Sequence, residues 1–155
     1  MAERECGGCT ACCKTHMVLA INKPPMTWCE QCAVGRGCKT YNQRPRDCSV
    51  FKCLWLLGRL PEHERPDKTR IVIDLIPSPL LGHDTIGIYE VSWGALNTEP
   101  ARREKNRALE SNCVVTEMMS SGKLRMTFPQ GYRLSKEKGE TLVRELVEIS
   151  LYRPR

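Results

Sequence analysis

Nine of the ten cysteines in this 155-residue chain lie in its first 53 residues. They are Cys6, Cys9, Cys12, Cys13, Cys29, Cys32, Cys38, Cys48 and Cys53. So many neighbouring thiols have three ordinary uses: disulfide bonds, thiolate ligands for metal ions, and redox reactions. The remaining 102 residues contain only Cys113, so the enrichment needs a local cause.

The spacing of the cysteines favours metal ligands. Two residues between cysteines let both thiols of one tight turn reach the same ion. Three pairs have this spacing: Cys6/Cys9, Cys9/Cys12 and Cys29/Cys32. In an extended segment, adjacent Cys12 and Cys13 would point to opposite sides, which suits two ions or a bridged pair. We therefore predict a binuclear centre, in which nine cysteines leave one spare thiol or some bridging thiolates.

Charge and composition agree with bound metal. The first 53 residues contain eight Lys or Arg and four Asp or Glu, and this surplus would balance eight thiolates around two divalent ions. Few large apolar residues accompany them, so metal would supply stability that a small core cannot. Most of the formal charge of +6 thus lies among the cysteines. Nucleic-acid binding through this segment, with Trp28, Tyr41 and Trp55 stacking on bases, is the less favoured alternative.

Disulfides are the alternative that depends on the cellular compartment. The segment from Met1 to Cys6 has neither the basic start nor the apolar stretch of an export signal. The longest apolar run, Cys53 to Leu57, is too short to span a bilayer. We expect a cytoplasmic protein that does not enter a membrane. In the cytoplasm its thiols would stay reduced.

A longer motif accompanies the later cysteines. The chain begins with C-x2-C-x2-C-C, and a second element follows, made of Cys38, Tyr41, Arg44, Pro45, Cys48, Phe51 and Cys53. Together these resemble a bacterial cysteine-cluster family described as zinc- or iron-chelating domains, over about the first third of the chain. The resemblance implies chelation of zinc or iron. Family members usually place one more cysteine between the two elements, for which Cys29 and Cys32 are candidates.

Several other residues near the cysteines invite a role. Arg44 would either donate to a metal-bound thiolate or be an ordinary surface charge. Tyr41 and Phe51 are expected to form a small core beneath the site. His16 would either replace a thiolate or be an ordinary polar residue. Cys113 is expected to be a buried small hydrophobe in a helical region.

Beyond residue 54 the chain has α+β patterns. Alternation and turn residues predict strands at 68–75 and 85–91, paired antiparallel, a third at 123–128 and a fourth at 131–134. Helices are predicted at 101–110 and 136–151, with 114–119 extending the first helix or forming a turn. The apolar face of the last helix would contain Leu142, Val143, Leu146, Val147 and Leu151. Basic side chains of the first helix, Arg102, Arg103, Lys105 and Arg107, are a weaker candidate for a phosphate site.

We predict one α+β domain, residues 1–155. A cysteine-rich, metal-bound lobe, 1–53, would be followed by a small antiparallel sheet with about two helices, 54–155. No G-x-S-x-G, P-loop or H-E-x-x-H motif indicates an enzyme. The predicted function is therefore chelation of Zn2+ or iron, in a structural or metal-handling role. Alternatives are an iron-sulfur redox protein or enzyme, and a zinc-stabilised module that binds nucleic acid or another protein.

Overall fold

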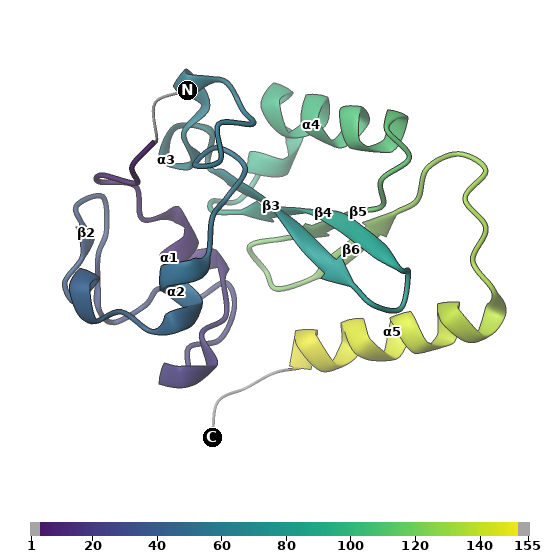
Figure 1. The fold of residues 1–155 in the computed structure, drawn as a ribbon, viewed down its shortest axis with the longest axis horizontal. Helices are drawn as coiled ribbons and strands as arrows, with labels where there is room; N and C mark the ends of the chain where they lie inside the picture. Colours follow the sequence, from purple (N-terminus) through teal and green to yellow (C-terminus); the bar gives the residue numbers. More distant parts are fainter. Residues whose placement is uncertain (1–3, 152–155) are drawn as a thin grey trace.

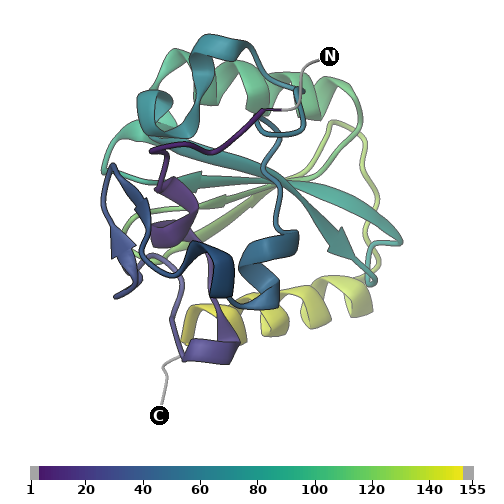
Figure 2. The same cartoon turned by 60° about the vertical axis from the view of Figure 1, so that its left-hand side comes forward.

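The sheet at the centre of the molecule separates its two long helices. In the computed structural model, which describes residues 4–151, the chain is α+β. Helix α4 (Glu99–Glu110) lies on one side of the sheet and α5 (Lys136–Leu151) on the other (Figures 1 and 2). The cysteine-bearing segment packs against one end of this arrangement (Figure 1).

The cysteine-bearing segment contains only short elements. In chain order these are α1 (Ala11–Thr15), η1 (Leu19–Ile21), β1 (Cys32–Ala33), β2 (Gly37–Cys38), η2 (Tyr41–Gln43) and α2 (Arg46–Val50). Strands β1 and β2 pair antiparallel. Along the chain, η3 (Glu62–Glu64) and α3 (Pro66–Thr69) follow this segment and precede the sheet. Elements this short gain little from their own backbone hydrogen bonds and depend on packing.

The main sheet has four strands in the order β3-β4-β5-β6. They are β3 (Ile71–Ser78), β4 (His83–Glu90), β5 (Val115–Met118) and β6 (Leu124–Thr127). Strands β3 and β4 form the predicted antiparallel hairpin, although β3 begins at Ile71 because residues 68–69 belong to α3 and Arg70 ends that helix. Strand β5 pairs antiparallel with β6. Strands β4 and β5 are parallel, and η4 (Ala95–Asn97) and α4 connect them.

The prediction of a purely antiparallel sheet is therefore wrong at the β4–β5 pair. Parallel neighbours need a long crossover, and the helix predicted at 101–110 supplies it. The prediction that 114–119 extends this helix or forms a turn is also wrong. Asn112, with φ of 59°, follows the helix, and the fully buried Val114 and Val115 then enter the sheet. Residues 131–134 lie in a turn and loop instead of a fourth strand.

The predicted final helix is confirmed, but its apolar face is confirmed at one position only. Leu142 is buried, whereas Val143 is 61% exposed. The side chains of Leu146, Val147 and Leu151 lie outside the described part of the structure. Among the described residues, no helix combines the length and apolar character needed to cross a membrane.

One hydrophobic core joins the cysteine-bearing segment to the sheet. Val72, Ile73 and Ile88 of the sheet pack in the same cluster as Trp55 and Cys53. The backbone N–H of Leu54 donates to Ile73 O at 2.7 Å. Cys53 is therefore held by the core of the molecule as well as by its own segment.

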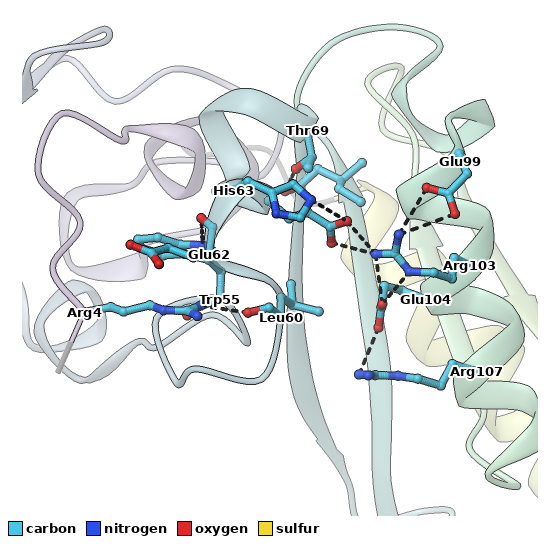
Figure 3. A network of polar contacts seen from close by, with 12 residues as sticks. Arg4, Trp55, Leu60, Glu62, His63, Thr69, Glu99, Arg103, Glu104 and Arg107 are labelled. Carbon is cyan, nitrogen blue, oxygen red and sulfur yellow. Dashed lines mark hydrogen bonds and ion pairs between the residues drawn. The ribbon is translucent and has the colours of Figure 1, made fainter. Parts of the chain in front are cut away.

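Within the described part of the chain, ion pairs occupy three of the four basic side chains of α4, all but Arg102 of the predicted phosphate patch. Arg103 pairs with Glu64 at 2.6 Å, with Glu99 at 3.1 Å and with Glu104 at 3.2 Å (Figure 3). Arg107 pairs with Glu104 at 2.9 Å. Lys105 pairs with the buried Glu117 at 2.7 Å. Because these cations already have carboxylate partners, α4 is a poor phosphate site.

Candidate metal centre

All nine N-terminal cysteines line one cavity of about 1390 Å3. Cys53 is buried, the other eight are partly buried, and each is a free thiol in this structure. Cys113 lies in the turn after α4, away from this cavity, and its thiol faces Ser111 O at 3.7 Å. It is not helical, so that part of the prediction is wrong, but it is partly buried and packs against the hydrophobic core, as expected of a small hydrophobe.

Two of the C-x2-C pairs form the tight turns that their spacing predicts. The Cys9 N–H donates to Cys6 O at 2.9 Å, and the Cys32 N–H donates to Cys29 O at 3.0 Å. Cys32 also lies directly opposite Cys38 across the β1–β2 pair. Each turn brings two thiols to the cavity over a short stretch of chain.

Backbone contacts fasten these turns to α1. The Cys29 N–H donates to Cys13 O at 3.0 Å, and the Gly35 N–H at the tip of the β1–β2 hairpin donates to Thr10 Oγ1 at 3.0 Å. A Cβ atom at Gly8 would lie 3.0 Å from Gly35 O, so the absence of a side chain allows this close approach. The hairpin thus packs directly on the C-x2-C-x2-C-C segment.

Cys12 and Cys13 lie on α1, so the expectation that they occupy an extended segment is wrong. Successive side chains on a helix are about 100° apart, which points both thiols to the same cavity. The Cys12 thiol raises the pKa of Cys13 most strongly, and burial raises it further. Burial and the Cys13 thiol raise the pKa of Cys32 to about 11.

The thiols fall into two groups by proximity. Burial raises the pKa of Cys48, and the thiols of Cys13, Cys29 and Cys38 raise it further. Cys48, Cys29 and Cys38, together with Cys12 and Cys32, form a loop group, and Cys13 lies between this group and Cys6. Burial also raises the pKa of Cys53, with further increases from two other neighbours, Cys6 and Cys9. Cys6, Cys9 and Cys53 form a core group.

Backbone N–H groups point at two sulfur atoms of the core group. The backbone N–H groups of Leu56 and Trp55 act to lower the pKa of Cys53, and those of Ala11 and Asp67 act to lower the pKa of Cys9. Burial dominates and raises both pKa values, while these N–H groups oppose it. Such donors stabilise a sulfur atom more when it is ionised or bound to a metal.

Two of the cations that line the cavity, Lys23 and Arg44, are coupled electrostatically to its thiols. Lys23 is 5% exposed, and its Nζ donates to the carbonyl oxygens of Lys14 at 3.2 Å, Pro24 at 3.0 Å and His16. Burial lowers the pKa of Lys23, and nearby thiols, Cys29 first, oppose this change. Arg44 is the second cation, and its charge counteracts the effect of burial on the pKa of Cys6. Both favour thiolates in the cavity.

The aromatic residues of the motif differ in their environments. Phe51 packs against the core and contacts the His16 ring at 4.1 Å between centroids, as predicted for a small core beneath the site. Tyr41 is 52% exposed, so the same prediction is wrong for it. The short turn η2 leaves Tyr41 at the surface, where the Arg44 guanidinium lies 3.9 Å from its ring centre.

His16 lines the cavity, but both its ring nitrogens have partners. Nε2 lies 3.0 Å from Asp74 Oδ2, and Nδ1 lies 2.8 Å from Thr15 Oγ1. The ring packs between Phe51 and Tyr89. Ligation would require His16 to leave these partners, which favours a structural polar role. Asp74 was missed at the sequence level, although an acid within a β-branched strand was a signal for it.

Thiol ligands suit a soft or borderline metal, but the thiols in this structure are not arranged at the distances of a metal site. Among residues 4–151, no three Cys, His, Asp or Glu side chains are close enough to hold one metal ion. Thiolate ligands lie about 2.3 Å from zinc, so several thiols would have to turn inward. The cavity brings the cysteines together, and binding would complete their arrangement.

Comparison with known proteins gives no match to a family model, a curated protein or a solved structure.

Proposed function

We propose that this protein chelates zinc or iron through its nine N-terminal cysteines. One observation carries the proposal: thiols spread over residues 6–53 converge on the wall of a single cavity. The resemblance of the motif to zinc- or iron-chelating domains points to the same chemistry. Since four thiolates complete a tetrahedral site, nine of them suit about two ions per chain.

The surroundings of the cavity support a metal that also stabilises the fold. Val34, Tyr41 and Val50 are all more than half exposed, so this segment has little core of its own. A thiolate-bound ion would connect its turns and short helices, because metal binding to a loosely packed site adds directly to folding free energy. Zinc suits this structural role because it is redox-inert and prefers four thiolate or imidazole ligands.

The cations of the cavity support thiolate chemistry. Metal binding must remove protons from thiols whose pKa values are raised by burial. Lys23 and Arg44 offset part of the negative charge that would then accumulate. An iron-sulfur centre would use the same ligands and the same compensation, and it is the alternative that the metal analysis distinguishes.

The test is elemental analysis and absorption spectroscopy of protein purified without oxygen. We expect about two equivalents of metal per chain, either zinc in a colourless protein or iron. A brown protein that bleaches in air would indicate an iron-sulfur centre. A protein that binds no metal when zinc or ferrous iron is supplied, with its thiols paired as disulfides, would overturn the proposal.

A pair of variants shows whether the cavity is the site. Cys13→Ser removes the thiol that faces both groups, and Cys113→Ser removes the cysteine outside the cavity. We expect Cys113→Ser to retain all its metal and Cys13→Ser to lose at least half. Equal metal content in the two variants would mean that other residues hold the ion.

A further inference from the structure

The core group of thiols is built into the rigid part of the molecule. Cys53 is 9% exposed and belongs to the hydrophobic core, and the next residue, Leu54, donates its N–H to Ile73 O of β3. Cys9 packs against the same core. To move either thiol far, the contacts at this end of the sheet must open.

Side-chain contacts brace both ends of this group. Arg4 donates to Trp55 O at 2.7 Å and to Leu60 O at 2.9 Å, and its guanidinium lies 5.0 Å from the Trp55 ring centre (Figure 3). Asp67, whose N–H points at Cys9, is held by Arg65 through contacts of 2.7 and 2.9 Å. The backbone donors that face Cys9 and Cys53 are therefore fixed before any ion arrives.

Apart from Cys12 on α1, whose Ala11 and Thr15 are buried, the loop group lies on segments with far less support. Its members Cys32 and Cys38 lie on two-residue strands, and Cys48 lies on the five-residue helix α2. Val34 and Val50, beside them, are 60% and 63% exposed. Segments with few buried apolar contacts open locally at much lower free energy than a core.

We propose that the thiols form two unequal centres, a retained one at the core group and an exchangeable one at the loop group. This inference rests on the proposed metal chelation. Cys13 lies where the groups meet, because it is near Cys6 of the core group as well as Cys12 and Cys32 of the loop group. A thiolate at this position can bridge the ions and complete the coordination of the core group. Release of the loop ion to a chelator converts each freed thiolate to a thiol with a proton from water.

The division predicts two rates of metal loss. The experiment uses the full-length, metal-loaded protein, adds excess chelator, and follows the bound ions by native mass spectrometry. Alkylation of the freed thiols, mapped by peptide, shows which cysteines open first. We expect one ion to leave at least ten times faster than the other, with Cys32, Cys38 and Cys48 labelled before Cys9 and Cys53.

Matched variants assign the rates to the groups. Cys38→Ser should lack the fast ion and keep the slow one, whereas Cys53→Ser should show the reverse. Where Cys53→Ser fails to fold, Cys6→Ser tests the same group from a partly buried turn. Loss of all metal in a single phase, simultaneous labelling of both groups, or loss of the same ion in both variants would refute the division. In those cases the wild-type protein still binds metal, whereas a wild-type protein without metal would refute the proposed function itself.

Discussion

Gly87 offers a sharp test of how the sheet supports the cavity. It lies in β4 directly opposite Asp74 of β3 and is buried. In Gly87→Ala the new Cβ would lie 2.5 Å from Asp74 Oδ1, 2.7 Å from Ile76 Cδ1 and 2.8 Å from Tyr89 Cε2. Ordinary contacts between such atoms are about 3.5–4.0 Å, so three side chains on two strands must move.

The cost follows from these overlaps. Overpacking a buried site costs about 1–3 kcal/mol, because the neighbours leave their preferred rotamers. For a chain of this size, each kcal/mol lowers the melting temperature by about 2–4 °C. We therefore expect Gly87→Ala to melt about 2–12 °C lower. Displacement of Asp74 would also disturb its 3.0 Å contact with His16 on the cavity wall.

The assay is thermal and urea unfolding followed by circular dichroism, on wild-type and variant proteins with equal metal content. Gly139→Ala in α5 is the control, because the nearest atom to its new Cβ is Leu134 Cδ2 at 3.7 Å. Alanine is the better helix former by about 0.8–1.0 kcal/mol, so this variant should be slightly more stable. A Gly87→Ala protein as stable as the wild type would refute the close packing at Asp74.

Three further predictions concern charge, oxidation and metal. Burial alone would raise the pKa of Glu117, but hydrogen bonds from Arg125 and Lys105 outweigh it and lower this pKa. The ionised Glu117 therefore stabilises the fold fully above the ordinary pKa of a glutamate, and this stabilisation is lost as the pH falls through the lowered pKa. Glu117→Gln should therefore cost about 1–3 kcal/mol at pH 7 and less in acid, measured by urea unfolding. In metal-free protein a mild oxidant should join Cys32 to Cys38 in a disulfide, detected by peptide mapping. The hydrogen bond from Lys39 N–H to Gln31 O flanks this pair, so it is a non-hydrogen-bonded pair of the antiparallel strands, with Cα atoms about 4.5 Å apart. A disulfide can span that distance. When the free metal concentration is a thousand times the dissociation constant, bound metal should stabilise the fold by about 4 kcal/mol. Removing the metal should therefore lower the free energy of unfolding by that amount, measured as the shift in the urea midpoint.

Each of these predictions has an outcome that contradicts it. A destabilisation by Glu117→Gln that is constant between pH 3 and 7 would show that the ionised carboxylate is not what stabilises the sheet. Oxidation that leaves Cys38 free while Cys32 pairs elsewhere would contradict the β1–β2 register. Identical urea midpoints with and without bound metal would mean that the ion adds nothing to folding.

The local features of the site could be predicted from the sequence. Neighbouring residues alone form the turns at Cys6–Cys9 and Cys29–Cys32, because each is closed by a hydrogen bond over three residues. The alternation that gives β3 and β4 and the proline in the first turn of α4 are local in the same sense. The convergence of the nine thiols was likewise a prediction from their spacing, although their coordination of metal stays a proposal.

Contacts between distant parts of the chain decided the rest. From its sequence, the segment that forms β5 could have extended the preceding helix or paired with either edge of the β3–β4 hairpin. The burial of Val114 and Val115 beside β4 decides its position. Spacing alone does not reveal that His16 turns to Asp74, 58 residues away, instead of the thiols beside it.

The sequence by itself therefore determined which chemical groups are present and how neighbouring thiols are paired in turns. The tertiary structure decided which thiols are held by the core and which lie on exposed loops, because burial depends on residues far apart in the chain.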